Sequence, residues 1–250
     1  IMLDKIKNIH PRIVISFIGL VYAILIIINP YKNIHYGDIG LMYVQVQDII
    51  DSGYSKFSLS YKGESIDPEY KFFPYKKPFV GEVNQKHYFV FPPYFLLMNA
   101  ILFQLLGNDG LFVLNFLAFL LTLFLIYKLG SQFELDNFFI NFSIVLYVFG
   151  MTSSNYNFVF HELPFSILWI TLSIYFSFLY LRDKRNLHLL LFGFFGAISL
   201  FFRLEMVFII VACGVTLQLA LRNNFWQILK FSIIGFIFPF SIFIFFNYQI

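Results

Sequence analysis

The sequence predicts an all-α integral membrane protein with about seven transmembrane helices. Of its 250 residues, 59% are hydrophobic and only 12% are charged, whereas a soluble domain carries about 25% charged residues. The mean hydropathy of +0.76 agrees with this composition. Several apolar stretches also approach the length of about 20 residues that a helix needs to cross the hydrocarbon core. Lipid is therefore the expected solvent for most of the chain.

The first predicted span covers residues 13–29 and follows Lys5, Lys7 and Arg12. A basic start before an apolar stretch is typical of a signal peptide, but no small-residue cleavage site follows, so we expect an uncleaved anchor. The next region is polar as far as Tyr88 and holds half of the 14 acidic residues. We interpret residues 30–110 as a long first extracytoplasmic loop that carries one or two amphipathic interfacial helices.

The remaining spans are expected within residues 111–250, which would complete a single transmembrane domain over 1–250. Their expected bounds are 111–130, 138–152, 163–181, 187–202, 206–221 and 231–247. Ile250 lies within or just past an apolar stretch, so we expect the sequence to be the N-terminal part of a longer protein. The only cysteine, Cys213, excludes an internal disulfide.

The short apolar segment 93–106 decides the predicted orientation, because its length is typical of an interfacial or re-entrant helix. If it lies at the outer surface, the basic residues outside the long loop all fall on one side, as the positive-inside rule requires. We therefore expect a multi-pass protein of the bacterial inner (plasma) membrane with a cytoplasmic N-terminus. The basic residues concerned are Lys5, Lys7, Arg12, Lys128, Arg182, Lys184, Arg185, Arg222 and Lys230.

Three polar groups would then share the extracytoplasmic face. Asp38 follows the first span, His161 and Glu162 precede the span at 163–181, and Arg203 and Glu205 lie in an outward turn. Charges close to the hydrocarbon are costly and usually face a cavity or a partner. We therefore predict an outward-facing pocket at the lipid boundary.

Each group also has a purely structural interpretation. Asp38 could cap an amphipathic helix, since Met42 and Val46 follow at helical spacing. The His161-Glu162 pair could be a polar turn before Pro164 at a helix start. Arg203 and Glu205 could form a local surface pair worth about 0–1 kcal/mol. The functional interpretation is favoured because all three groups are predicted on the same side of the membrane.

The order of several short motifs resembles a known family. Tyr36-Gly37-Asp38 opens an amphipathic helix that ends near Ser52-Gly53, and a loop with the segment 79–88 follows. Phe91-Pro92-Pro93 then precedes an apolar stretch that closes at Leu106-Gly107, and His161-Glu162-Leu163-Pro164 opens a later span. In this order and spacing the chain resembles the polytopic GT-C glycosyltransferases, especially the protein-mannosyltransferase and aminoarabinose-transferase-like branch.

The resemblance implies that Asp38 acts as the general base on an acceptor hydroxyl. The donor would be a sugar on a polyprenyl phosphate, with Arg203 as the cation for the lipid phosphate. Glu162, His161 and Glu205 would complete the substrate site, and Glu162 could instead hold a divalent metal ion, the one candidate cofactor. Many family members have two adjacent acidic residues where this chain has Asp38-Ile39, which puts a metal requirement in doubt.

Two other classes of function stay open on the sequence alone. A transporter or flippase of a lipid-linked saccharide would place ionisable groups near the middle of its spans, whereas here they lie toward the span ends. A non-catalytic membrane subunit would need none of Asp38, Glu162 and Arg203. Nucleic acid is not an expected partner, since the chain lacks a basic stripe. The expected partners are membrane lipids, the lipid-linked donor and an acceptor that is a lipid, a glycan or a protein.

Overall fold

The protein is described by a computed structural model that covers residues 9–28, 37–61, 63–73, 79–83, 86–91, 93–150, 156–221 and 224–249. The chain divides into two compact units. The first, here called the membrane unit, comprises Ile1–Asn29 and Phe112–Ile250. The second, here called the loop unit, comprises Pro30–Leu111. Within the expected motifs, Tyr36, Asn84, Gln85 and Pro92 lie outside the described residues, as do Lys5, Lys7 and Arg222.

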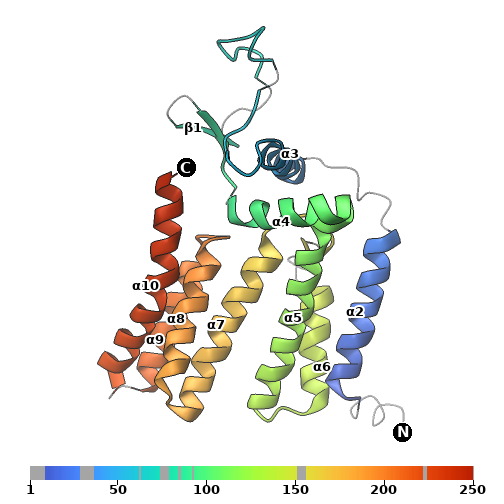
Figure 1. Cartoon of the computed structure of the whole chain (residues 1–250). Helices are drawn as coiled ribbons and strands as arrows, with labels where there is room; N and C mark the ends of the chain where they lie inside the picture. The colour runs from blue at the N-terminus through green and yellow to red at the C-terminus, as the bar shows by residue number, and fades with distance from the viewer. Residues whose placement is uncertain are drawn as a thin grey trace. The chain divides into compact units, whose positions relative to one another are not determined.

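The membrane unit is a bundle of helices whose neighbours along the chain run in opposite directions (Figure 1). The helix α6 continues directly into a π-helical turn, η2. The elements are α2 (Pro11–Ile28), α5 (Gly110–Gln132), α6 (Asn137–Val145), η2 (Leu146–Gly150), α7 (Leu163–Asp183), α8 (Asn186–Leu200), α9 (Met206–Ala220) and α10 (Phe225–Gln249).

The predicted membrane class is confirmed in outline. Among the described residues, four helical stretches are long and apolar enough to cross a membrane: Pro11–Ile28, Pro93–Gln132, Leu163–Asp183 and Phe225–Phe245. Three further apolar helices are shorter, at Asn137–Gly150, Asn186–Leu200 and Met206–Ala220. The last helix begins at Phe225 rather than at residue 231. A lysine near a helix end, here Lys230, can keep its ammonium group at the interface while its stem lies along apolar surface.

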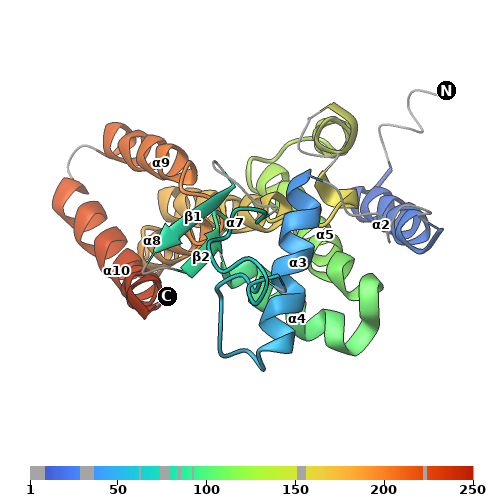
Figure 2. The same cartoon turned by 90° about the horizontal axis from the view of Figure 1, so that it is seen from above.

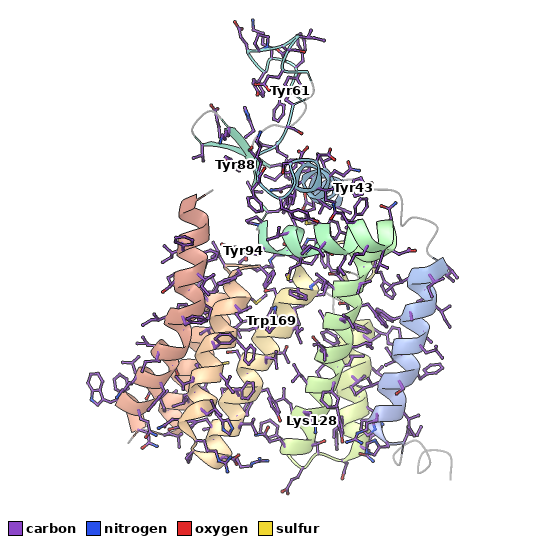
Figure 3. All side chains as sticks on the ribbon, in the orientation of Figure 1. Tyr43, Tyr61, Tyr88, Tyr94, Lys128 and Trp169 are labelled. Carbon is purple, nitrogen blue, oxygen red and sulfur yellow. The ribbon has the colours of Figure 1, made fainter. Side chains whose placement is uncertain are left out.

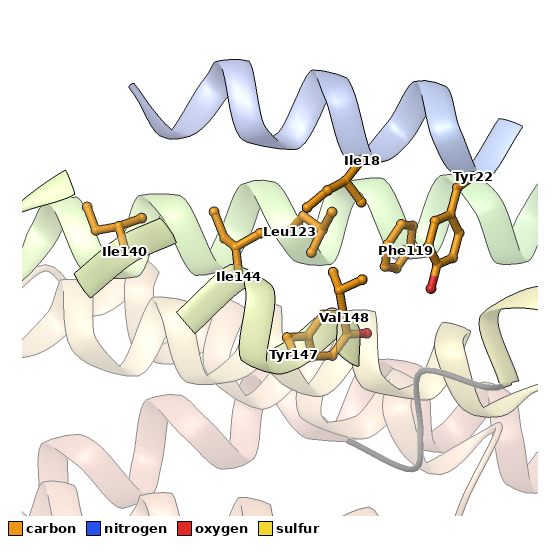
Figure 4. Close-up of a cluster of buried hydrophobic side chains, with 8 residues drawn as sticks. All are labelled: Ile18, Tyr22, Phe119, Leu123, Ile140, Ile144, Tyr147 and Val148. Carbon is orange, nitrogen blue, oxygen red and sulfur yellow. The ribbon is translucent and has the colours of Figure 1, made fainter. Parts of the chain in front are cut away.

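Aromatic and aliphatic side chains join α2, α5 and α6 into one buried cluster (Figure 4). The Tyr22 ring of α2 stacks on Phe119 of α5 at 4.1 Å and on Phe158 at 3.9 Å between centroids. At the other end of the pair, the Arg12 guanidinium lies 5.6 Å from the Tyr127 ring. The start of α2 therefore lies beside the end of α5, and the two helices are antiparallel.

The helix α8 packs against both α7 and α10 (Figure 2). Two serine hydroxyls of α7 donate to carbonyls of α8: Ser173 to Phe192 at 2.8 Å and Ser166 to Ser199 at 3.3 Å. Toward α10, Gly193 of α8 lies against the Ser232 carbonyl, and Gly235 of α10 lies against the Leu190 carbonyl. Small residues that let two backbones approach closely are typical of helix contacts in membranes.

The loop unit contains α3 (Gly37–Asp51), a hairpin of β1 (Val80–Val83) and β2 (Lys86–Phe89), α4 (Pro93–Leu106) and the 3-10 turn η1 (Gly107–Asp109). The predicted amphipathic helix is confirmed, because α3 buries Met42, Val46 and Ile49. It ends before Gly53, whose φ of +61° favours glycine. In the hairpin, Val80 pairs with Phe89 and Val83 with Lys86 in antiparallel register.

The segment 93–106 is a separate helix that packs on α3 within the loop unit. Tyr43 of α3 meets Phe103 of α4 edge to face at 5.6 Å. The Tyr54 hydroxyl, just beyond α3, donates to Gln104 at 2.7 Å. Gly107, with φ of +63°, follows α4 and separates it from α5.

Candidate functional site

Four of the five predicted site residues come together at one end of the membrane unit. His161 and Glu162 immediately precede α7, and Arg203 and Glu205 lie in the turn between α8 and α9. The N-termini of α7 and α9 thus flank this group, here called the Arg203 cluster. Because the first N–H groups of a helix lack partners within the helix, such ends carry partial positive charge and favour anions.

Arg203 holds the cluster together through two carboxylates. Its Nη1 lies 3.6 Å from Glu162 Oε1, and its Nη2 lies 3.2 Å from Glu205 Oε1. The two acids differ in their surroundings, since the Glu162 side chain is 7% exposed and that of Glu205 is 65% exposed. Arg203 itself is 30% exposed. The guanidinium therefore bridges a buried carboxylate and a solvated one.

The local sequence explains why a buried carboxylate is tolerated at residue 162. The Glu162 carbonyl accepts the Ser166 N–H at 3.0 Å and so starts α7. Pro164 occupies the first turn, where its missing N–H costs nothing. The positive end of the helix and the Arg203 guanidinium then compensate the carboxylate charge. Glu205 precedes α9, and its carbonyl accepts the Phe208 N–H at 3.2 Å. The hydrogen bond from Arg203 is the main cause that lowers the Glu205 pKa.

His161 is neutral in this environment. Its Nδ1 accepts the Leu163 N–H at 3.1 Å and lies 3.3 Å from Glu162 Oε2. A nitrogen that accepts a hydrogen bond carries no proton, so the contact with Glu162 is not an ion pair. Burial lowers the His161 pKa to about 4, and the nearby Arg203 charge acts in the same direction. The imidazole therefore keeps its Nε2–H as a donor.

The His161 environment predicts a loss of stability in mild acid. The pKa is about 4 in the folded protein and near 6.5 when solvated, so the unfolded chain binds the extra proton first as the pH falls. Between about pH 7.5 and pH 5 this should cost the folded state about 2 kcal/mol, at 1.36 kcal/mol per pKa unit. Thermal unfolding in detergent should show a fall in Tm that His161→Asn reduces.

His10 provides the matched control for this measurement. Its Nδ1 also accepts an N–H two residues ahead, from Arg12 at 3.2 Å, but the side chain is exposed. His10→Asn should therefore keep the acid sensitivity of the natural protein. A His161→Asn variant whose Tm falls as steeply as the natural protein would contradict the assignment of the acid sensitivity to this imidazole.

Asp38 belongs to the loop unit, whereas the Arg203 cluster belongs to the membrane unit. It lies in the first turn of α3, directly after Gly37 with φ of +56°, and its side chain is exposed. The helix N-terminus favours its negative charge. Within the described part of the chain, its carboxylate makes no hydrogen bond or ion pair. The Asp38 carboxylate is therefore exposed at the start of α3.

The aromatic side of the Arg203 cluster is a feature that the sequence did not single out. The Tyr156 ring lies 4.5 Å from the His161 ring, and Asn157 beside it is buried. The Asn115 side chain of α5 donates to the Val159 carbonyl at 2.6 Å and fixes this segment to the bundle. Only the presence of several polar residues just before His161 could have indicated that the segment turns inward.

The donor set of the cluster does not match a metal site. Among the residues that the structure describes, no three His, Cys, Asp or Glu side chains gather as ligands of one ion. Instead, the Arg203 guanidinium supplies the positive charge between Glu162 and Glu205. No family model matches the chain, and neither does any curated protein or solved structure.

Proposed function

We propose that this chain is a GT-C-type membrane glycosyltransferase that moves a sugar from a polyprenyl-phosphate donor to an acceptor hydroxyl at the extracytoplasmic face. The observation that carries the proposal is Arg203, held by buried Glu162 at the end of an apolar bundle and flanked by two helix N-termini. A guanidinium in that place suits the phosphate of a lipid whose chain lies in the membrane.

The charge distribution supports the proposed orientation. Lys128 lies at one end of the membrane unit (Figure 3). Arg12 lies at the same end, since both side chains approach the Tyr127 ring. Phe133, just after α5, packs on Phe178 at 4.8 Å and brings the end of α7 to the same side. We take this basic end as cytoplasmic. The Arg203 cluster, at the other end of α8, is then extracytoplasmic.

The antiparallel pair of α2 and α5 supports seven crossings. Since the chain leaves α2 and re-enters α5 at the same end of the membrane unit, an even number of crossings separates the two helices. The simplest count is zero, with α4 outside the hydrocarbon core and α2 and α5–α10 as the spans. The shorter helices are α6 with η2 over Asn137–Gly150 and α8 and α9 with 15 residues each. They would cross where the bilayer thins locally.

Arg203 can exchange one carboxylate for a phosphate. An exposed pair such as Arg203–Glu205 is worth about 0–1 kcal/mol. A phosphate offers a bidentate, charge-assisted contact that is roughly twice as strong as a neutral hydrogen bond. Exposed Glu205 can therefore swing into water while buried Glu162 keeps the guanidinium in place.

The proposed reaction is a single displacement. The Asp38 carboxylate takes the proton of the acceptor hydroxyl as its oxygen attacks the anomeric carbon of the sugar. The bond from that carbon to the phosphate oxygen breaks, and its electron pair leaves with the polyprenyl phosphate. Arg203 stabilises the phosphate charge that develops. Attack opposite the leaving group inverts the anomeric configuration.

A transporter or flippase of a lipid-linked saccharide is the weaker alternative. In α2 and α5–α10 the acidic and basic side chains Arg12, Lys128, Arg182, Asp183, His188 and Lys230 all lie within two turns of a helix end. A translocation path would require such groups at mid-membrane depth. The interior of the bundle instead carries serines that bond neighbouring carbonyls, such as Ser173.

The proposal predicts that Arg203→Ala weakens binding of a polyprenyl phosphate by roughly 10- to 100-fold, the equivalent of losing about 1.5–3 kcal/mol of charge-assisted contact. Binding of a fluorescent polyprenyl phosphate to the full chain in nanodiscs measures this effect. Arg182→Ala is the matched control. Arg182 also pairs with a neighbouring acid, Asp183 at 2.8 Å, but at the basic end. Equal affinity of the two variants would reject phosphate binding by Arg203.

Glu205→Gln also tests phosphate binding by Arg203, but here the expected change is a gain of affinity. If phosphate displaces Glu205, removing that carboxylate should tighten binding of the same probe by about 2- to 5-fold, since the exposed pair is worth at most about 1 kcal/mol. If Arg203 and Glu205 form only a structural pair, Glu205→Gln should leave probe binding unchanged or weaken it.

A further inference from the structure

The loop unit contains a cavity of about 510 Å³ that no sequence motif indicated. It lies between the C-terminal end of α3, the segment 56–61 and the start of β2. This volume falls within the range of about 300–1,000 Å³ that small-molecule sites occupy. The lining includes Asp48, Asp51, Lys56, Ser58, Lys86 and His87.

The cavity walls are held in place by hydrogen bonds of both side chains and backbone groups. Asp48 accepts hydrogen bonds from the Ser60 backbone N–H, at 3.2 Å, and from the Ser60 hydroxyl. The Leu59 N–H donates to the His87 carbonyl at 2.8 Å and ties the segment to β2. Such fixed walls reduce the entropic cost of binding a ligand.

Next to these walls, the buried carboxylate of Asp67 organises the adjoining loop. Asp67 accepts the N–H groups of Lys71 at 3.0 Å and Phe72 at 2.7 Å, and the Tyr61 hydroxyl at 3.1 Å. Burial raises the Asp67 pKa, but these hydrogen bonds outweigh it and the net pKa is lowered. The Tyr61 side chain, labelled in Figure 3, is thereby fixed where it lines the cavity.

The charges of the lining nearly cancel. Asp48, Asp51 and Glu64 contribute carboxylates, and Lys56 and Lys86 contribute ammonium groups. A site for an anion or a cation would show one dominant sign. Mixed acceptors and donors, together with the hydroxyls of the lining serines, instead suit a neutral ligand that both donates and accepts many hydrogen bonds.

Aromatic rings form one wall of the cavity. Tyr70 stacks on His87 at 4.8 Å with an interplanar angle of 22°, and Tyr61 lies 5.2 Å from Tyr70. Burial and the nearby Glu64 carboxylate both raise the pKa of the Tyr70 hydroxyl. An aromatic surface beside carboxylates and ammonium groups offers apolar contact for the C–H face of a sugar ring and polar contact for its hydroxyls.

We propose that this cavity binds a neutral oligosaccharide. At 1.5 Å of rise per residue, the α3 positions Asp38 and Asp51 are separated by about 20 Å. The cavity is thus a site distinct from the proposed base, and a ligand that reached both would have to be several sugars long. Binding here does not depend on sugar transfer, although such a ligand would be the acceptor if the proposed transfer occurs.

The test is binding of maltotriose, mannotriose and chitotriose to the full chain in nanodiscs, measured by saturation-transfer NMR and calorimetry without any lipid-linked donor. At least one of the three should bind, and Asp51→Asn and Lys86→Ala should each weaken it by about 10-fold, as expected for loss of one polar contact to a charged group. Both residues are exposed, so neither change should prevent folding. Glu69→Gln is the control, because Glu69 pairs with Lys71 at 2.7 Å in the same loop but does not line the cavity.

Failure to bind any of the three saccharides would overturn the inference, as would binding that Asp51→Asn and Lys86→Ala leave unchanged. Saccharide binding that depends on these residues in a protein without transfer activity would support the inference and count against the proposed function. Transfer activity in a protein whose cavity binds no saccharide would overturn the inference and support the proposed function.

Discussion

Replacing Asp38 with asparagine is expected to lower sugar transfer by about 100- to 10,000-fold, the usual contribution of a general base. Asparagine has nearly the shape of aspartate, but its amide cannot take the proton from the hydroxyl that attacks the sugar. Asp38 is exposed in the first turn of α3, so the change should leave the fold intact. Turnover of a polyprenyl-phosphate sugar in reconstituted vesicles measures the loss, with thermal unfolding as the check on folding.

Two comparisons distinguish a role of Asp38 in proton transfer from a general effect of removing one negative charge. Glu82→Gln removes another exposed carboxylate of the loop unit, on β1, and should keep the natural turnover. Asp38→Asn should also keep the natural affinity for polyprenyl phosphate, because the base acts on the acceptor and not on the donor. Natural turnover in the Asp38→Asn protein would remove the general base from the mechanism.

The sequence predicted those elements whose signal is local. Met42, Val46 and Ile49 repeat at helical spacing, and they form the buried face of α3. Pro164 after a polar pair marked the start of α7. Helix periodicity and the preference of proline for the first turn depend on near neighbours alone, which is why a single sequence reveals them.

The Arg203 cluster could be predicted only as a shared membrane face. Alternating spans place Glu162 and Arg203 toward the same side, but their 3.6 Å separation depends on how α7, α8 and α9 pack. The burial of Glu162 likewise depends on that packing. The cavity of the loop unit left no signal, because its lining comes from separate segments without a common period.

Gly235→Ala is expected to prevent stable packing of α10 on α8. A Cβ added at Gly235 would overlap the Leu190 carbonyl, just as one at Gly193 would overlap the Ser232 carbonyl. Both obstacles are backbone atoms, so neither side chain rotation nor a small shift relieves them, and the cost should exceed the usual 1–3 kcal/mol or so of overpacking. Size-exclusion chromatography in detergent should show aggregated or destabilised protein.

Gly214→Ala provides the matched control within the same bundle. Gly214 lies in α9, and a Cβ there meets nothing within 4 Å, so alanine should be neutral or slightly stabilising through its better helix propensity. Because α8 leads directly into the turn that carries Arg203, Gly235→Ala should also abolish binding of polyprenyl phosphate, whereas Gly214→Ala should preserve it. A folded Gly235→Ala protein with natural affinity would show that the contact between α8 and α10 does not position the cluster.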